Sequence, residues 1–499
     1  MTRFNRIAII AVLTLCHVNC CAAFTSGVFG RQSPSSTRMN VLSEDLRQTT
    51  GTPTPPTEAE AETDDWWKTF ELNDAALPQE VRSQFPILSR VLGDDTDPKP
   101  LIYLDSAATS QKPNFVIDAL TSYYTSTNSN VHRGAHKLSR DATSQYEAAR
   151  TTVAKLVNAK REEIVFTSGA TEAINLVAYS WGRQNLKEGD EVITTVCEHH
   201  SNIVPWQMVC KERGAKLRYM GIVSGEATGD VLDVDALEGL LSPRTKLVTF
   251  QHVSNVLGAT HPLEAMVATI RSYNPNIKIL IDACQSVPHM PVDVQTLNID
   301  FLAASGHKLC GPTGIGFLWG REELLNSMDP FMGGGEMIMD VYQQESSYAP
   351  APGRFEAGTP AIAQAIGMGA AVEYIQKIGM ERIHAYEVEL AGYLVKRMES
   401  VEGVRILGPS GGAERAALVA FVTEGVHPSD LSTFLDMEGI AIRAGHHCCQ
   451  VLHRELGYSH SARASLYFYN TKEDVDFFIE KLVETLDFFR NIGNGDDSI

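Results

Sequence analysis

The most constraining feature of this sequence is a pair of short apolar runs that lie close together, each followed directly by polar residues. Residues 277–281 and 299–303 are rich in apolar and β-branched side chains, which is typical of short buried strands. Asp282 follows the first run, and Lys308 ends the polar stretch SGHK after the second. The pattern therefore predicts a carboxylate and a lysine at the ends of two neighbouring strands.

A carboxylate and a lysine placed in this way suit the cofactor pyridoxal 5'-phosphate (PLP). A lysine forms a Schiff base with its aldehyde, and an aspartate pairs with the pyridine nitrogen and keeps the ring an electron sink. Ser305 and His307 are polar donors for the phosphate, and the glycines of GPTGIG let the backbone pass close by. Taken singly, Asp282 also reads as a strand cap and Lys308 as a solvated loop lysine, so the prediction depends on the rest of the chain.

Composition excludes several other classes of protein. The 499 residues, 43% of them hydrophobic, are enough for a large core and more than one domain. A formal charge of -19 gives nucleic-acid binding no electrostatic support. The nine cysteines form no CxxC pair, which argues against a zinc ribbon, and they are too scattered for a disulfide scaffold. We expect no metal.

The N-terminal region reads as a two-part targeting sequence followed by a linker. Residues 1–23 have two arginines, an apolar run and the small-residue site CAA, which predicts a signal peptide. Residues 24–63 begin with an acid-free, Ser/Thr/Arg-rich segment of transit-peptide composition and end in a Pro/Thr/Glu linker. The arrangement resembles the presequence of algae with complex plastids, with Phe24 at the junction. It predicts import into the plastid stroma and a mature form without a membrane segment.

Alternation of strands and helices predicts an α/β fold with a mostly parallel sheet covered on both faces. We expect an N-terminal arm at 64–100, a large domain at 101–355, a smaller α+β domain at 356–490 and a tail at 491–499. Residues 163–182 read as a strand, a tight turn and a helix. Other expected strands are 101–105, 191–196, 246–253, 277–281, 299–303, 417–423 and 440–443. Other expected helices are 81–92, 113–125, 141–157, 204–213, 234–241, 263–273, 362–378, 380–401 and 474–489.

The turn TSGATEAIN is a candidate phosphate site. Gly169, Ala170 and Thr171 lie where a strand changes into a helix, and free backbone N–H groups there favour an anion. Thr171 adds a hydroxyl. PLP needs such a site away from its lysine, although a plain threonine helix cap remains the alternative.

Histidine and amide side chains follow further strands. In CEHHSN, His199 is placed to stack on a pyridine ring and pass protons. A zinc site is the rival interpretation, but His199 and His200 are adjacent and diverge, and no HExxH spacing is present. Asn255, in QHVSN, and Gln285 offer amides for the phenolic oxygen of the ring, though each alone is more often a structural hydrogen bonder.

The motif RAGHHCCQ predicts a reactive thiol. A cysteine flanked by His446, His447 and Arg443 is expected to be partly deprotonated, and the thiolate is the nucleophile. A metal site is the alternative, but four consecutive residues cannot close a tetrahedron around one ion. Further along, Arg463 in SARASLYFYN is able to clamp a carboxylate, or to form a surface salt bridge.

With these residues in place, the chain resembles a SufS-type cysteine desulfurase, a fold-type I PLP enzyme of the class V aminotransferase family. The resemblance runs from about residue 85 to residue 490 and implies a large domain with a seven-stranded-type sheet. It is carried by VHRGAHKLSRDAT, TSGATEAINLVA, EHHSNIVPWQ, HVSNVLG, IDACQSVPH, SGHKLCGPTGIG, FEAGTP, RAGHHCCQ and RASLYFYN.

The resemblance implies a role for each site residue. The catalytic residues would be Lys308, which holds PLP, Cys448, which attacks the substrate sulfur, and His199. The cofactor would be bound by Lys308, Asp282, Gln285, His199, Asn255, Ala170, Thr171, Ser305 and His307. Thr359 would reach the phosphate in the partner subunit of an obligate homodimer. L-cysteine would be bound by Arg463, Arg443 and Asn255.

The implied reaction converts L-cysteine to alanine and leaves a persulfide on Cys448. A SufE-like acceptor and a SUF scaffold would then use the sulfur for iron–sulfur cluster assembly, and selenocysteine is a second substrate to consider. The alternative is another fold-type I enzyme, an aminotransferase or a kynureninase-like hydrolase. The chain departs from the usual motif at Cys449, Val451 and Ala170, and in the sequence after Thr359. Cys449 is a vicinal thiol, able to accept or reduce the persulfide or to oxidise with Cys448.

Overall fold

The structure is a computed structural model that describes residues 77–94, 96–225, 228–410 and 415–493. These residues belong to one compact unit, which spans residues 66–499. The predicted signal peptide, transit-like segment and linker at 1–63 lie outside the described residues. Among the residues that are described, no helix has the length and apolar composition needed to cross a bilayer.

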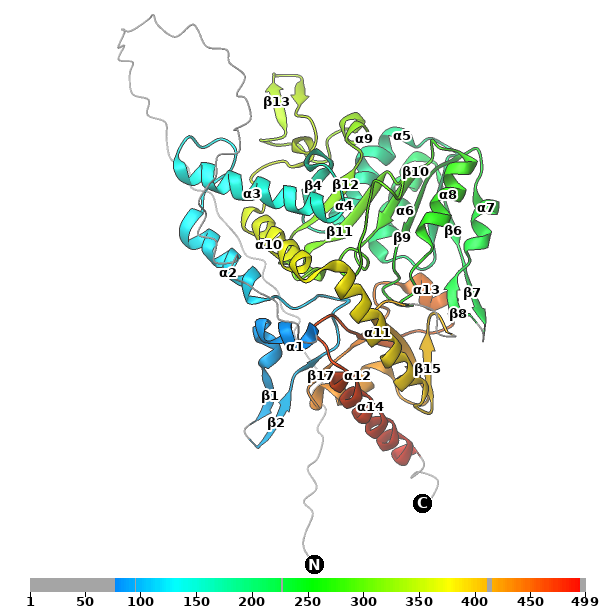
Figure 1. The fold of residues 1–499 in the computed structure, drawn as a ribbon. Helices are drawn as coiled ribbons and strands as arrows, with labels where there is room; N and C mark the ends of the chain where they lie inside the picture. Colours follow the sequence, from blue (N-terminus) through cyan, green and yellow to red (C-terminus); the bar gives the residue numbers. More distant parts are fainter. Residues whose placement is uncertain (1–76, 95, 226–227, 411–414, 494–499) are drawn as a thin grey trace, which may run out of the picture. The chain divides into compact units, whose positions relative to one another are not determined.

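A seven-stranded sheet forms the larger part of this unit (Figure 1). Its strands are parallel except for β12, which runs antiparallel to both of its neighbours. The order is β4 (Ile164–Thr167), β12 (Gly316–Gly320), β11 (Phe301–Ser305), β10 (Lys278–Asp282), β9 (Thr245–Gln251), β5 (Glu191–Thr195) and β6 (Lys216–Met220). The two runs that were predicted as neighbouring strands are β10 and β11, which pair directly. The mostly parallel α/β sheet is therefore confirmed.

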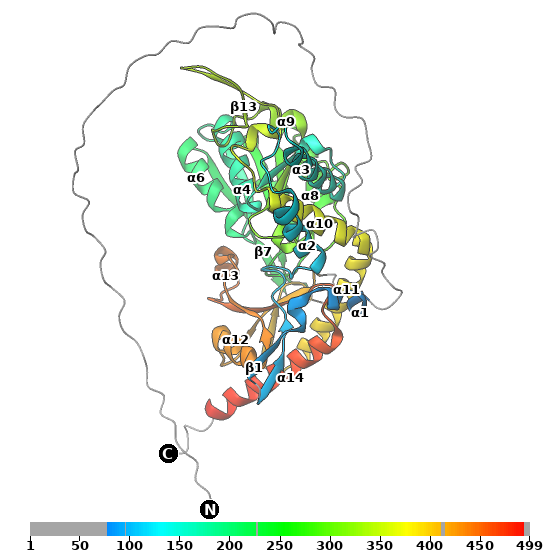
Figure 2. The same ribbon diagram turned by 90° about the vertical axis from the view of Figure 1, so that its left-hand side faces the viewer.

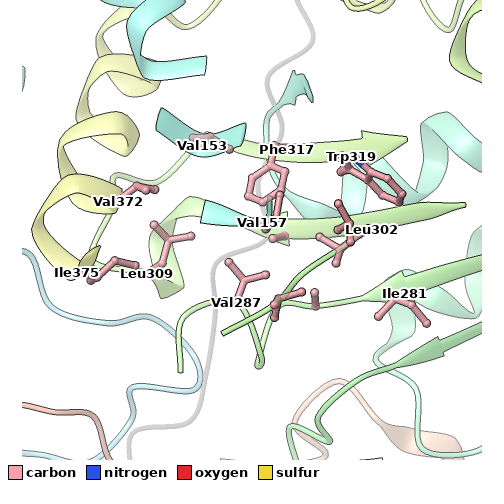
Figure 3. Packing of buried hydrophobic residues seen from close by; sticks show 14 of the residues in the cluster. Val153, Val157, Ile281, Val287, Leu302, Leu309, Phe317, Trp319, Val372 and Ile375 are labelled. Carbon is pink, nitrogen blue, oxygen red and sulfur yellow. The ribbon is translucent and has the colours of Figure 1, made fainter. Parts of the chain in front are cut away.

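Both faces of this sheet are buried, and alternate residues of each strand point to opposite faces. On β10, Ile279 and Ile281 belong to one hydrophobic core, and Leu280 belongs to another. Figure 3 shows part of the first core, where Val372 and Ile375 from a helix lie near the sheet residues. The first face is covered by α3 (Lys137–Leu156), α7 (Leu237–Leu240), α8 (Leu263–Tyr273) and α10 (Ile362–Ile378). The second is covered by α4 (Ala170–Leu176), α6 (Val204–Arg213) and α9 (Glu322–Ser327).

A second, four-stranded antiparallel sheet carries the C-terminal part of the chain. Its order is β15 (Val404–Leu407), β16 (Leu418–Thr423), β19 (Ser461–Ser465) and β18 (Arg443–Gly445). Helices α11 (Met380–Glu399), α12 (Pro428–Met437) and α14 (Lys472–Gly493) pack beside it around a separate core (Figures 1 and 2). The domain limits remain a prediction. The buried side chains of α10 lie in the core of the large sheet, together with those of α3.

Two predictions near the N-terminal end of the described chain need correction. The helix expected at 81–92 is wrong: α1 (Leu77–Val81) is followed by two 3-10 turns and then by β1 (Val91–Asp94), which pairs with β2 (Asp97–Pro100). Pro86 starts the second turn, and proline disfavours helix in the preceding residue. The strand expected at 101–105 exists as β3 (Ile102–Tyr103). It pairs in parallel with β17 (Ile440–Ala441), outside the large sheet.

Most of the other expected elements are present within a few residues of their predicted ends. They include α2 (Asn114–Ser122), α6, α8, α10, α11, α14, β4, β5, β9 and β16. Strands that were not predicted are β6, β12, β15, β19, β7 (Ile222–Gly225), β8 (Gly229–Leu232), β13 (Ile338–Val341) and β14 (Ser346–Tyr348). Short helices that were not predicted are α5 (Arg183–Asn185), α9 and α13 (Gln450–Glu455).

Candidate active site

A cavity of about 150 Å³ lies where the carboxyl ends of the central strands meet loops of the second sheet. It gathers every predicted site residue except one: Ala170, Thr171, His199, Asn255, Asp282, Gln285, Ser305, His307, Lys308, Arg443, Cys448 and Arg463. Thr359 is exposed and is not among the lining residues, so its role in a partner subunit stays a prediction. The other lining residues are Ala107, Ala108, Ser201, Gln251, Val253, Cys284 and His447, of which His447 had been named for its place beside Cys448.

Strand pairing places Asp282 at the floor of the cavity. Asp282 is the last residue of β10 and lies opposite Gln251 on β9 and Ala303 on β11. Its side chain is 6% exposed, and its Oδ1 accepts a hydrogen bond of 3.0 Å from the N–H of Cys284. A buried carboxylate held in this way is suited to pair with a protonated ring nitrogen.

Lys308 closes the 3-10 turn Gly306–Lys308, which follows β11 directly. The turn is braced from outside, because the N–H and Oγ of Ser110 both donate to the carbonyl of His307 at 3.1 Å. The Nζ of Lys112 donates to the same carbonyl at 3.0 Å. Lys308 therefore stands on a fixed backbone at the edge of the cavity that Asp282 lines.

Several hydrogen-bond donors from three loops line the cavity. The N–H of Ala170 donates to the Oγ of Ser305 at 2.9 Å, and the hydroxyls of Thr171 and Ser201 are 2.7 Å apart. Gly169 precedes them with φ +151°, a conformation that a residue with a Cβ rarely adopts. A set of hydroxyl and backbone donors without a carboxylate among them fits a phosphate group.

His199 is held by its own loop. Its Nδ1 accepts from the N–H of Ser201 at 3.2 Å, so the proton of the neutral ring is on Nε2. Burial, and then the positive charge of Lys308, lower the pKa of His199 to about 4. Burial similarly lowers the pKa of His307 to about 4. Both rings are therefore neutral at neutral pH.

A buried glutamate that the sequence analysis missed supports this loop. The Oε1 of Glu198 accepts from the Oγ1 of Thr195 at 2.6 Å and from the N–H of Gln251 at 3.1 Å. Its Oε2 accepts from the Nδ2 of Asn202 at 2.7 Å. Burial raises the pKa of Glu198 to about 8. These bonds tie the ends of β5 and β9 to the segment that carries His199.

Two arginines, Arg443 and Arg463, also line the cavity. Arg463 is 2% exposed, and its Nη1 donates to the carbonyl of Asn255 at 2.9 Å. Its Nη2 donates to Asp105 at 3.1 Å, and the exposed Arg443 donates to the other oxygen of Asp105 at 3.3 Å. The Nε of Arg463 is buried without a partner. A substrate carboxylate would meet a buried guanidinium that its neighbours already orient.

The cysteine loop, residues 446–449, joins β18 to α13 at the mouth of the cavity. His447 and Cys448 have φ of +51° and +58°, so the backbone turns in the left-handed region. Cys448 is exposed and lines the cavity, whereas Cys449 is fully buried. The Sγ of Cys449 donates to the Oδ1 of Asn255 at 3.2 Å, and burial raises the pKa of Cys449. Of the two adjacent thiols, Cys448 is the one presented to a substrate, and the buried Cys449 thiol is poorly placed to exchange sulfur.

The predicted electrostatics of this loop are wrong for His447. Burial, and then the charge of Arg463, lower the pKa of His447 well below its ordinary value, so the ring is neutral. Its Nε2 lies 3.0 Å from the Oγ of Ser461, on the second sheet. His447 therefore supplies no positive charge to Cys448. Arg443 remains a cation that lines the same cavity.

Within the described ranges, no group of three or more histidine, cysteine or acidic side chains is arranged to hold a metal ion. His199 and His200 diverge: the first bonds within its own loop, and the second bonds the backbone at Gln450. The hydroxyl and backbone donors, Asp282 and Lys308 fit PLP instead, since they match its phosphate, ring nitrogen and aldehyde.

The fold and this cavity define the class of PLP-dependent enzymes built on a mostly parallel α/β sheet. Comparison with known proteins identifies the family. The Aminotransferase class-V family model matches residues 102–478. A "Probable cysteine desulfurase" from Synechocystis sp. is 53% identical over 416 residues, which are 83% of this chain and 97% of that protein. The chain belongs to the cysteine desulfurases of the class-V aminotransferase family.

Solved structures agree with this assignment. The cysteine desulfurase CsdA (S-sulfonic acid) from Escherichia coli is 39% identical, with a TM-score of 0.75 over 83% of this chain and all of that one. The apo cysteine desulfurase from Thermococcus onnurineus NA1 is 38% identical, with a TM-score of 0.77 over 83% of this chain and 99% of that one. The resemblance inferred from the motifs is confirmed.

Proposed function

We propose that this protein removes sulfur from L-cysteine with PLP as its cofactor, giving alanine and a persulfide on Cys448. The observation that carries the proposal is the single cavity that Cys448 shares with Lys308, Asp282 and Arg463. An aminotransferase or a kynureninase-like hydrolase needs the lysine and the aspartate but has no use for an exposed thiol there.

The residues of the chain divide the work between binding, proton movement and sulfur transfer. Arg463 binds the substrate carboxylate, and Lys308 takes the proton from Cα and returns it to the product. PLP, when bound, withdraws electrons from Cα, which favours loss of the Cα proton and weakens the C–S bond of the substrate. The Cys448 thiolate attacks the substrate sulfur: an S–S bond forms, the C–S bond breaks, and its electron pair stays with the carbon. That carbon takes a proton, and the product leaves as alanine.

The direct test is an assay of the purified protein with L-cysteine and a thiol reductant. Alanine and sulfide should form in equal amounts without any added 2-oxo acid. An aminotransferase would instead require the oxo acid and would release no sulfide. L-selenocysteine should be turned over by the same route, because Cys448 would attack selenium in place of sulfur.

Replacing Arg463 by alanine should mainly weaken substrate binding. A hydrogen bond to a charged group contributes about 1.5–3 kcal/mol, so KM for cysteine should rise about ten- to hundredfold. Arg443→Ala is the comparison variant: Arg443 also lines the cavity and shares the Asp105 partner, but it is exposed, so we expect a smaller rise in KM. The PLP content of both variants, read from visible absorbance, should equal that of the wild type. An unchanged KM in Arg463→Ala would remove this residue from the substrate site.

The active form is proposed to be a homodimer in which Thr359 of one subunit completes the phosphate site of the other. What supports the proposal is the exposure of Thr359 outside its own cavity and the family's FEAGTP motif. Light scattering should report twice the monomer mass. Mixing Thr359→Ala subunits with inactive Lys308→Ala subunits should then give hybrid dimers with one intact site, in which one subunit supplies Lys308 and the other supplies Thr359. The mixture should regain activity, whereas two kinds of defective monomer would not.

The sulfur is proposed to pass to a small SufE-like acceptor and then to a SUF-type scaffold for iron–sulfur cluster assembly. The exposure of Cys448 at the cavity mouth supports this, since a persulfide there is accessible to another protein. Adding such an acceptor should increase the rate of alanine formation at saturating cysteine.

The destination is proposed to be the plastid stroma. Residues 1–40 contain four arginines and no acidic residue, and an apolar signal-like run precedes the transit-like part. Secretion fits the first half alone, and an oxidising compartment would tend to disable a catalytic thiol. Mitochondrial import fits the arginines but not the apolar run.

A fusion of residues 1–45 to a fluorescent reporter, expressed in an alga with a complex plastid, should label the stroma. The same fusion with Phe24→Ala should stay at the plastid periphery, because Phe24 lies at the predicted junction. Secreted or mitochondrial fluorescence from the wild-type fusion would contradict the proposal.

A further inference from the structure

His200, which the proposed chemistry does not use, bonds the backbone at Cys448 and at the start of α13 just after the cysteine loop. The backbone N–H of His200 donates to the carbonyl of Cys448 at 2.8 Å. The N–H of Gln450 donates to the Nε2 of the His200 ring at 3.1 Å. One residue of the large-sheet part therefore bonds the backbone twice, at the carbonyl of the reactive cysteine itself and at the N–H two residues further on.

The loop needs such a support. His447 and Cys448 both have positive φ, a conformation that costs non-glycine residues free energy and persists only where contacts hold it. A thiol that must reach a substrate sulfur also has to be held within a fraction of an ångström. The bonds from His200 supply part of that restraint.

The residue next to His200 in the sequence, His199, links this contact to the cofactor cavity. His199 lines the cavity, and the rings of His199 and His200 are 6.3 Å apart at their centroids. The 3-10 turn that follows His199 is itself held by the buried carboxyl of Glu198 through Asn202. One short segment thus sets the position of a ring in the cofactor cavity and of the backbone that carries Cys448.

We propose that His200 is a positioning residue for sulfur transfer, which acts through its neutral ring by accepting from Gln450 and so fixing the cysteine loop. The inference rests on the proposed function, because it concerns the step in which Cys448 takes the sulfur. It assigns His200 no contact with substrate or cofactor.

The bond to the ring exists only while His200 is neutral, since a protonated imidazole has two donors and no acceptor. Burial, and then the positive charges of His446 on the cysteine loop and Arg454 on α13, lower the pKa of His200 below its ordinary 6.5. Because the pKa of His200 is depressed in the folded protein, the ring is neutral and the bond is present at pH values above that pKa. The bond is lost as the pH falls through the pKa. The pH profile of sulfur transfer should therefore have an acid limb, a fall in rate at low pH, that is caused by protonation of His200.

The test compares three substitutions in the full-length enzyme loaded with PLP. His200→Ala removes the acceptor. His200→Gln keeps an acceptor near the position of Nε2 but does not titrate, and His200→Asn is its matched control because its side chain is one methylene shorter. Each keeps the backbone N–H. Single-turnover formation of alanine, KM for cysteine and the visible spectrum are measured across the acidic range.

Loss of one hydrogen bond should slow alanine formation about three- to tenfold in His200→Ala and His200→Asn, with KM and the cofactor spectrum unchanged. His200→Gln should stay within about twofold of the wild type and should lack the acid limb, whereas His446→Gln should retain it. Wild-type rates in His200→Ala, or an unchanged acid limb in His200→Gln, would overturn the inference. Absence of alanine from the wild type would instead sink the proposed function.

Discussion

The Lys308→Ala variant should lose the visible absorbance of covalently bound PLP and at least about a thousandfold in the rate of alanine formation. Lys308 has two tasks, since its amine links the cofactor and its free form moves the proton at Cα. Among the described residues that line the cavity, Lys308 is the one lysine. No other amine there is placed to take over either task.

Lys112 provides the matched control for this experiment. Burial lowers the pKa of Lys112 to about 8, and its Nζ bonds the carbonyl of His307, one residue before Lys308. Lys112→Ala should keep the absorbance band and a substantial part of the activity, because Lys112 does not line the cavity and, within the described part of the chain, bonds only the carbonyls of Ser110 and His307 and the hydroxyl of Thr109. A Lys308→Ala enzyme that retained the band, or one that still turned over cysteine at the wild-type rate, would show that the assignment is wrong.

The Cys448→Ser variant should bind PLP and L-cysteine normally but form no alanine or sulfide above background. Serine keeps the shape of the side chain, but its oxygen cannot store the sulfur as a persulfide. Cys448 is the exposed thiol at the cavity, and the peptide that carries it is fixed by the hydrogen bond to His200. The spectral change on addition of cysteine should therefore survive although turnover is lost.

Cys449→Ser is the natural control, because Cys449 is the next residue but its thiol is buried and bonds Asn255. We expect most of the activity to remain, since a hydroxyl can donate to the same oxygen. The reverse result, with Cys449 essential and Cys448 dispensable, would exchange the roles of the two thiols.

The part of the site that the sequence predicts well consists of residues at strand ends. Asp282 and Lys308 follow two apolar runs, and in a parallel sheet the carboxyl ends of the strands meet at one edge. The same reasoning placed His199 and Ala170, because each follows a strand of the same sheet. Cys448 and Arg463 lie outside that sheet, and their association with it depended on the family resemblance.

The partners of these residues were not predictable, because they depend on contacts between distant segments. Asp105 orients Arg463 across 358 positions in the sequence, and it follows a strand that pairs with β17 instead of with the large sheet. The charge of His447 and of Glu198 depends on how deeply each side chain is buried. The local sequence around a loop does not indicate whether a polar side chain in it is buried. β12 was missed because its five residues, GFLWG, are bounded by glycines that indicate a loop.

The central claim is that Cys448 takes the sulfur atom of L-cysteine. Its most direct test is mass spectrometry of the peptide containing both cysteines after a single turnover without reductant, with alanine measured in the same sample. We predict one additional sulfur atom on Cys448, none on Cys449, and alanine in equal amount. Alanine without added sulfur on Cys448, or the added sulfur on Cys449 alone, would contradict the account.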